Sequence, residues 1–449
     1  MRPTFQTDLF NSKIVVSAAA AALALGVSAQ PAYAQPDRAE AAMQAGNGPE
    51  AEAAHSITLQ SDPNNLKALV GRGTARAWQK NWSGAISDLN RALAIDPSNL
   101  EARVALGYAN AWSGQYATAE SNFQRALALA PDSQSAKKGL AYSAYWAGRN
   151  EDAAQQFEKL AYEIPDDPEP LVGVGMARLA NGNAGRAAKA YKSALAIDSA
   201  REDAKKGLTA AYDYPALAEL SVWGGTTSGG GDAGLRLVEL ASWVTPRTRI
   251  WAKYDNGLSL DNPVLARTGA NAETFYGGVL QQIGDNFLAL GEIGFRNLPA
   301  GQNQEIYKVE GTYLSKLGAT KAGVQISPHS AGFTDRLLYA GQNLRLNKNL
   351  SFEPTVYLAR TGASRDDEWR LVGYGEYKTD DYSIGVGIGG GNVSSINPLA
   401  DGGVFVAYAN ASIRVGGWHR LHFNVTREEA PLNSFTRFLA GVTFRLPRN

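Results

Sequence analysis

The stretch that decides the first part of the fold is LEARVALGYANAWSGQYATAESNFQRALALAPDS, residues 100–133. Its pattern recurs on both sides, because prolines stand at Pro63, Pro97, Pro131 and Pro165, each 34 positions after the last. Several other columns of residues keep the same period, and such agreement between independent columns is very hard to obtain by chance. The sequence therefore contains an internal repeat with a period of 34 residues.

The residue types in these columns fit a pair of packed helices. A glycine in the left-handed conformation ends the first helix, and the proline stops the second. An alanine and a large residue four positions later share one face of the second helix, where they pack toward the next pair. The columns are Trp78, Trp112 and Trp146; Gly114, Gly148 and Gly182; Ala85, Ala119, Ala153 and Ala187; and Leu89, Phe123, Phe157 and Tyr191.

These columns resemble the tetratricopeptide repeat (TPR), a helix pair that recurs with the same period. We predict four full repeats over residues 66–201, a half-repeat that starts near Gln35, and a last helix over residues 202–212. The resemblance implies an α-solenoid over residues 35–213 that offers a concave surface to a peptide or protein partner and performs no chemistry itself.

Polar residues on the first helices are candidates for contact with such a partner. The tryptophan column allows two interpretations, contact in the groove or packing between repeats, and tryptophans at this spacing more often pack. The candidate groove residues are Arg72, Arg76, Asn110 and Arg178.

The N-terminal segment is typical of an export signal. Arg2 and Lys13 supply positive charge, residues 14–27 form an apolar run, and Ala32-Tyr33-Ala34 has the small residues of a cleavage site. We therefore predict a signal peptide over residues 1–34, removed before Gln35. A buried N-terminal helix is the alternative.

Composition narrows the remaining choices. A chain of 449 residues exceeds one ordinary core, so at least two domains are expected. The 43 basic and 43 acidic residues balance, which argues against nucleic acid as a partner. The absence of cysteine excludes a lipidated N-terminus, disulfides and thiolate metal sites. No apolar run is long enough for a membrane-spanning helix, so a membrane-embedded chain has to be a barrel.

Beyond Asp213 the composition changes to glycine, aromatic residues and short segments of alternating polarity. Near the C-terminus, Phe438 and Phe444 belong to an apolar face, while Arg437 and Arg445 belong to the other. A period of two with one apolar face indicates antiparallel strands. We predict an antiparallel transmembrane β-barrel of about 12–14 strands over residues 216–449, and hence a multidomain α + β chain.

The connections between strands support a barrel of the outer-membrane type. Short turns, such as residues 284–286 and 346–349, alternate with longer polar stretches, such as residues 256–271 and 391–403. This alternation and a final strand with aromatic residues at the chain end are typical of outer-membrane barrels. A soluble β-sandwich or β-propeller in the periplasm is the alternative.

The polar face of the predicted strands carries charges of both signs. We predict no catalytic, cofactor or metal site and no enzymatic activity, because neither a nucleophile–base spacing nor a ligand cluster appears. The candidate lumen residues are Lys253, Glu292, Arg296, Lys308, Glu310, Arg370, Glu376, Arg420 and Arg437.

The combination of signal peptide, TPR array and C-terminal barrel resembles the TPR-porin exporters of cellulose and poly-N-acetylglucosamine, and the smaller YaiO type. The resemblance implies an outer-membrane protein of a Gram-negative bacterium that exports an exopolysaccharide. It also implies a TPR domain in the periplasm that recruits protein partners, and a barrel in contact with outer-membrane lipids. Two alternatives stay open: a non-conducting barrel that anchors the TPR scaffold, and an outer-membrane barrel hydrolase.

Overall fold

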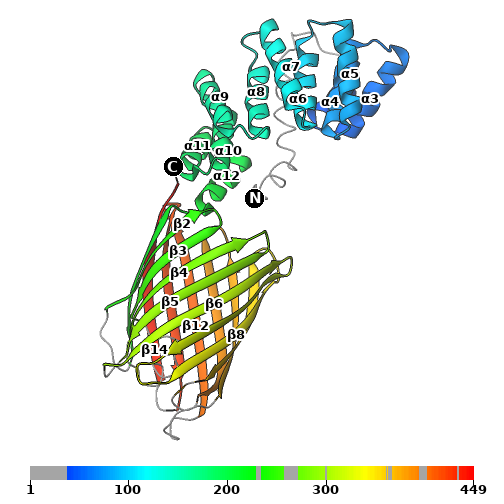
Figure 1. Ribbon diagram of the computed structural model, residues 1–449. Helices are drawn as coiled ribbons and strands as arrows, with labels where there is room; N and C mark the ends of the chain where they lie inside the picture. Colours follow the sequence, from blue (N-terminus) through cyan, green and yellow to red (C-terminus); the bar gives the residue numbers. More distant parts are fainter. Residues whose placement is uncertain are drawn as a thin grey trace. The chain divides into compact units, whose positions relative to one another are not determined.

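The computed structural model describes residues 38–228, 234–256, 272–298, 301–360, 362, 367–393, 402–431 and 434–448. The predicted signal peptide, residues 1–34, lies outside these ranges. The chain divides into a helical unit that ends at Tyr214 and a β-unit that begins at Pro215 (Figure 1).

In the described part of the helical unit, eleven helices follow one another as antiparallel neighbours. The pairs α4/α5, α6/α7, α8/α9 and α10/α11 are the four predicted repeats, and α12 is the predicted last helix. The bounds are α2 Arg38–Gln44, α3 Gly48–Ser61, α4 Leu66–Trp78, α5 Trp82–Ile95, α6 Leu100–Trp112, α7 Tyr116–Leu129, α8 Gln134–Trp146, α9 Asn150–Glu163, α10 Pro168–Ala180, α11 Ala184–Ile197 and α12 Glu202–Asp213. No helix in the described ranges is long and apolar enough to span a membrane.

The turn inside each pair has the conformation that the glycine column predicts. Gly114, Gly148 and Gly182 have φ angles of 85°, 81° and 79°. This left-handed region suits glycine because glycine has no Cβ atom to clash. In the first repeat Lys80 stands at the same position with a φ of 62°, so there the turn is made without glycine.

Each large side chain of the second-helix column is enclosed by small residues of the first helices. Phe123 on α7 is fully buried. A Cβ atom added at Gly107 would come within 2.6 Å of its ring, and one at Gly139 would overlap it. Phe123 therefore joins two successive repeats through glycines. The same arrangement holds Phe157 against Gly173, and Tyr191 between Gly175 and Gly207.

The tryptophan column packs between repeats, the interpretation that the sequence favours. Trp112 lies against the core formed by the first repeats, and Trp146 lies against two successive core clusters. Their rings also contact tyrosines one turn earlier, with centroid distances of 5.6 Å for Tyr108–Trp112 and 5.4 Å for Tyr142–Trp146.

In the described part of the β-unit, fourteen antiparallel strands form a closed barrel, which is the upper end of the predicted range. Each strand pairs with its neighbour in sequence, and β1 closes on β14. The bounds are β1 Ala218–Thr227, β2 Gly234–Thr245, β3 Thr248–Asp255, β4 Glu273–Ile283, β5 Phe287–Asn297, β6 Asn303–Ser315, β7 Gly318–Pro328, β8 Thr334–Arg345, β9 Leu350–Arg360, β10 Asp367–Lys378, β11 Tyr382–Val393, β12 Gly402–Val415, β13 His419–Glu429 and β14 Ser434–Leu446.

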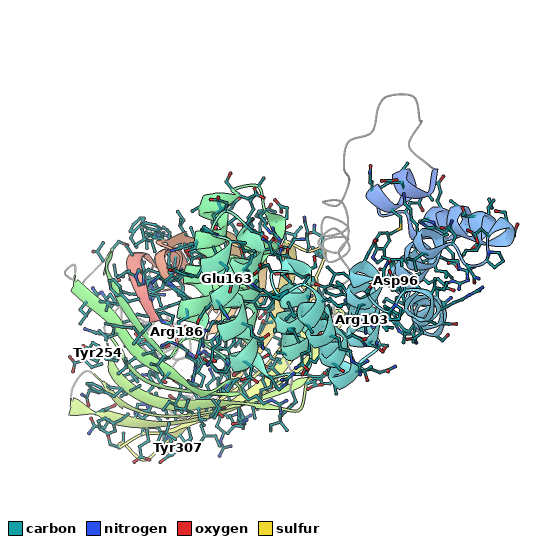
Figure 2. All side chains as sticks on the ribbon, turned by 90° about the horizontal axis from the view of Figure 1, so that it is seen from above. Asp96, Arg103, Glu163, Arg186, Tyr254 and Tyr307 are labelled. Carbon is teal, nitrogen blue, oxygen red and sulfur yellow. The ribbon has the colours of Figure 1, made fainter. Side chains whose placement is uncertain are left out.

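The side chains alternate between an apolar outer wall and a mixed polar inner wall. On β13, Leu421 and Phe423 are exposed on the outside, whereas His422 and Asn424 lie on the inside. Figure 2 shows Tyr254 and Tyr307 on the outside of the barrel. Successive side chains of a strand point to opposite faces of the sheet. The alternating polarity of the sequence therefore places apolar residues on the outer wall and polar residues on the inner wall.

Most exposed aromatic residues of the outer wall lie near the two ends of the strands, with mainly aliphatic residues between them; Phe423, near the middle of β13, is an exception. The end with the short turns carries Phe287, Tyr313, Phe352, Tyr377 and Phe444. The other end carries Phe275, Phe295, Tyr307, Trp369 and Phe405. Aliphatic residues between them include Val279, Ile293, Val309, Leu371 and Val386.

Candidate functional site

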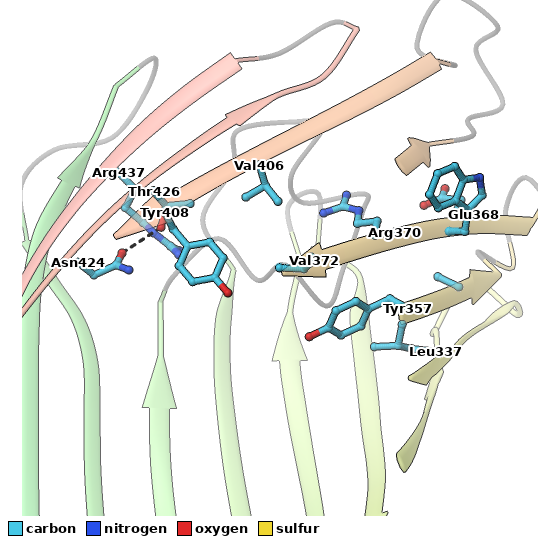
Figure 3. A pocket seen from close by; sticks show the side chains of 12 residues that line it. Leu337, Tyr357, Glu368, Arg370, Val372, Val406, Tyr408, Asn424, Thr426 and Arg437 are labelled. Atoms are coloured by element: carbon cyan, nitrogen blue, oxygen red, sulfur yellow. Dashed lines mark hydrogen bonds between the residues drawn. The ribbon is translucent and has the colours of Figure 1, made fainter. Parts of the chain in front are cut away.

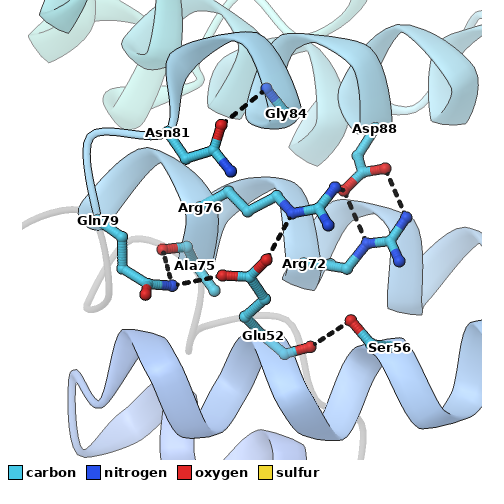
Figure 4. Close-up of polar contacts among 9 residues, drawn as sticks. All are labelled: Glu52, Ser56, Arg72, Ala75, Arg76, Gln79, Asn81, Gly84 and Asp88. Atoms are coloured by element: carbon cyan, nitrogen blue, oxygen red, sulfur yellow. Dashed lines mark hydrogen bonds and ion pairs between the residues drawn. The ribbon is translucent and has the colours of Figure 1, made fainter.

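The predicted groove arginines of the first repeat bind a carboxylate within the solenoid. Asp88 on α5 is buried, and it accepts hydrogen bonds from Nε and Nη2 of Arg72 at 2.8 and 2.7 Å. Arg76 donates to Asp88 and to Glu52, both at 2.8 Å (Figure 4). The hydrogen bonds with Asp88 raise the pKa of Arg72 although burial opposes this. Arg72 and Arg76 thereby tie α4 to α5 and α3.

The other two groove candidates also have partners within the solenoid. Arg178 on α10 is 5% exposed and donates to Glu158 and Glu151 of α9 at 2.8 and 2.7 Å. Asn110 is buried and donates to the carbonyl of Leu106 at 2.8 Å. The contact of these residues with a protein partner stays a prediction.

The cluster around Asp88 leads to a testable expectation. Replacing Asp88 by alanine leaves two guanidinium groups without their shared acceptor, and hydrogen bonds to charged groups contribute about 1.5–3 kcal/mol. We expect Asp88→Ala to lower the free energy of unfolding of the helical unit by that amount, measured by urea denaturation followed by circular dichroism at 222 nm. Asp166→Ala, at an exposed position between α9 and α10, is the control. Equal effects of the two variants would contradict the structural role.

The nine predicted lumen residues lie on the inner wall, several of them in contact with groups on neighbouring strands. Lys253 Nζ lies 3.4 Å from Glu292 and 4.2 Å from the centre of the Tyr276 ring. Glu310 accepts a hydrogen bond from the Tyr339 hydroxyl at 2.5 Å, and Lys308 lies over the same ring. Both signs of charge therefore occur side by side.

The remaining candidate lumen residues differ in their contacts with the inner wall. Arg296 is 1% exposed and donates to Thr274, Tyr276 and Gln304, so its guanidinium belongs to the wall. Arg370 lies 3.6 Å from buried Glu428. Arg420 Nη1 lies 3.4 Å from the Ser412 hydroxyl. Glu376 lies opposite Gly385 in the strand register. Arg437 lines a cavity described below.

The inner wall also carries aromatic rings that our sequence analysis did not select. A Cβ atom added at Gly278 would overlap the Trp251 ring, and one at Gly387 would overlap the Tyr408 ring. These rings therefore lie along the wall, over glycines of adjacent strands. The same contact joins Trp223 to Gly441, Tyr339 to Gly323, and Tyr374 to Gly385. A tyrosine or tryptophan that alternates with polar residues, opposite a glycine in the next strand, is the signal that reveals them.

A cavity of about 220 Å³ opens on the inner wall between β8 and β14. Figure 3 shows Tyr357 and Tyr408 with their hydroxyl groups directed toward one another. The lining of the cavity combines aromatic, apolar and charged groups. The lining residues are Leu337, Tyr357, Ala359, Glu368, Arg370, Val372, Val406, Tyr408, Asn424, Thr426 and Arg437, and Trp369, which is exposed on the outer wall, also borders the cavity.

The described histidines and carboxylates are the groups that bear on metal binding and catalysis. In the described ranges, no group of three or more His, Asp and Glu residues could hold a metal ion. His329 lies 3.6 Å from Asp335, and His422 Nε2 lies 3.0 Å from the Thr443 hydroxyl. The absence of enzymatic activity stays a prediction.

Comparisons with known proteins find the repeat in the helical unit. Two family models described as tetratricopeptide repeat match residues 37–99 and 112–171. No curated protein matches the chain. Similar solved structures include a TPR protein from Parabacteroides merdae, with 23% identity, a TM-score of 0.36, and coverage of 39% of this chain and 69% of that one. YrrB, a TPR protein with an unusual peptide-binding site, has 19% identity, a TM-score of 0.30, and coverage of 37% and 87%.

Proposed function

We propose that the chain is an outer-membrane transport component whose barrel passes an exopolysaccharide and whose periplasmic TPR array recruits protein partners. The observation that carries the proposal is the division of the barrel into an apolar outer wall and a polar, mixed-charge inner wall. A non-enzymatic role agrees with this arrangement, and the proposal includes it.

The outer wall supports a position in a membrane. Phe287 and Phe295 mark the two aromatic zones at opposite ends of β5. Their separation along the strand is roughly 26 Å at about 3.3 Å per residue, which a strand tilt of about 40° reduces to roughly 20 Å along the barrel axis. Tilted strands in outer-membrane barrels carry an apolar band about 25 Å tall between two aromatic girdles. The barrel has the same sequence of zones, with aliphatic residues such as Ile293 between the aromatic ones.

The connections support the orientation. The first and last strands pair with Ala218 opposite Leu446, so both ends of the barrel chain lie at the same rim. The short turns, such as residues 284–286, belong to this rim. Short turns of outer-membrane barrels face the periplasm. The TPR array, which precedes β1 in the chain, is therefore assigned to the periplasm.

The inner wall supports transport of a polar polymer. Adjacent opposite charges, such as Lys253 and Glu292, present both donors and acceptors without a strong field of one sign. The rings of Trp251 and Tyr408 lie along the wall over glycines instead of crossing the interior. A sugar polymer has hydroxyl groups that match the polar groups, and apolar ring faces that match the aromatic rings.

The test is single-channel conductance of the mature chain, residues 35–449, refolded in detergent and added to a planar lipid bilayer. We expect discrete current steps, because a polar inner wall holds water and ions. The control is the same protein denatured by heat before addition. A folded, membrane-inserted barrel without current steps would overturn the transport proposal.

One observation favours a second candidate, a non-conducting anchor for the TPR scaffold. Arg296, Gln304 and Glu428 are each 1% exposed although they belong to the inner wall. Such burial shows that part of the interior is densely packed by its own side chains. Membrane insertion without current steps is the result expected for an anchor.

A further inference from the structure

The cavity between β8 and β14 has two aromatic sides, each held by further rings. Tyr408 is backed by Gly387, and its ring is stacked with that of Tyr374 at a centroid distance of 5.6 Å and an interplanar angle of 13°. Tyr357 contacts Tyr339 at a centroid distance of 5.8 Å. Because each ring is supported by a neighbour, its position is fixed before any ligand arrives, which lowers the entropic cost of binding.

The charged groups at this cavity balance one another. Arg370 and Arg437 line it together with Glu368, and Arg370 lies 3.6 Å from Glu428, which is 1% exposed. Two cations thus meet two carboxylates. Glu428 lies behind the lining, so a polyanion would bring its charges next to Glu368 in the cavity, and a polycation would bring them next to the two arginines.

The uncharged polar groups offer both donors and acceptors. Asn424 accepts a hydrogen bond from Thr426 at 3.0 Å, and an amide retains further donor and acceptor capacity. The hydroxyl groups of Tyr357 and Tyr408 can both donate and accept. A ligand rich in hydroxyl groups, which also donate and accept, satisfies such a lining.

We propose that Tyr357, Tyr408, Arg370, Asn424 and Arg437 form a binding subsite for an uncharged saccharide unit, hereafter the tyrosine subsite. The proposal rests on the proposed function, because it places a recognition point for the polymer inside the barrel. Its rings contact the apolar face of a sugar, and its arginine and amide groups hydrogen-bond the hydroxyls. The size of the cavity suits a single sugar ring within a longer chain.

The test is calorimetric binding to the detergent-folded mature chain, which does not require the barrel to conduct. The probes are two neutral hexasaccharides, cellohexaose and maltohexaose, with hexagalacturonate and hexaglucosamine as charged counterparts. We expect at least one neutral probe to bind, and the double variant Tyr357→Leu/Tyr408→Leu to weaken that binding by about tenfold or more, the effect of losing favourable ring contacts.

Matched variants separate recognition from folding. Tyr276→Leu removes an inward ring that does not line this cavity, so its affinity for the neutral probe should equal that of the parent chain. Heat-modifiable mobility on a denaturing gel must show that each variant is folded. Failure of both neutral probes to bind, tighter binding of a charged probe, or equal losses in the two variants would overturn the tyrosine subsite. A conducting barrel without such binding would leave the proposed function standing.

Discussion

Phe123→Ala is expected to lower the free energy of unfolding of the helical unit by about 3–5 kcal/mol, the usual cost of removing a buried phenylalanine ring. The ring is fully buried between Gly107 and Gly139, which belong to successive repeats. Its loss leaves a cavity at an inter-repeat interface, because glycines have no side chains that could fill it. Contacts between neighbouring repeats are what stabilises a solenoid, so cooperative unfolding should also be lost.

The measurement is urea denaturation of residues 35–449, the chain without the predicted signal peptide, followed by circular dichroism at 222 nm, where the helices dominate. Tyr162→Ala is the matched control, because Tyr162 is also on a second helix but is 89% exposed. We expect the control to change stability by less than about 0.5 kcal/mol. A similar loss in both variants would mean that Phe123 does not join the repeats.

Gly278→Val is expected to destabilise the barrel by about 3 kcal/mol, at the upper end of the usual cost of overpacking. A Cβ atom at Gly278 would overlap the Trp251 ring on the adjacent strand β3. The ring would have to leave the wall and enter the interior. The measurement is the temperature at which the heat-modifiable band of the folded barrel disappears from a denaturing gel.

The neighbouring glycine provides the control on the same strand. Gly277 faces outward, and an added Cβ atom there would meet nothing within 4 Å. Gly277→Val should therefore leave the barrel as stable as before or slightly more stable, since valine favours strands. In the Trp251→Ala background, Gly278→Val should cost less than in the parent chain. A cost that Trp251→Ala does not reduce would refute the ring-over-glycine contact.

Much of the fold could be predicted because its helices and strands are encoded by short-range patterns in the sequence. The repeated columns determine the helix pairs, and the glycines at 114, 148 and 182 end the helices with positive φ angles, as predicted. The alternation of polar and apolar residues reveals the strands. The barrel is predicted from the short turns that alternate with longer polar stretches and from the aromatic residues of the final strand. One difference is that β11 runs to Val393 and β12 begins at Gly402, inside the polar stretch of residues 391–403, because the pairing of the two strands continues there.

The candidate site was harder to predict because its contacts depend on how elements cross. Arg72 and Arg76 were selected as groove residues from their place on a first helix, but their shared partner Asp88 lies on the second helix of the same repeat. The alternation of polar and apolar residues distinguishes the inner wall of the barrel from the outer wall, but it does not reveal which side chains of different strands contact each other. Tyr357 and Tyr408 line one cavity although they belong to β9 and β12, and a strand-by-strand pattern carries no information about such pairs.

The central claim is that the barrel has its apolar wall in lipid and its polar wall around an aqueous interior. The chain has no cysteine, so each of residues 420–425 on β13 can be replaced in turn by a single labelled cysteine in barrels reconstituted in lipid vesicles. Nitroxide lipids should quench a dye at the odd-numbered positions, which include Phe423, and a charged water-soluble quencher should reach the even-numbered ones, which include Asn424. Quenching by nitroxide lipids at the even-numbered positions would contradict the account, and so would quenching that does not alternate between odd and even positions.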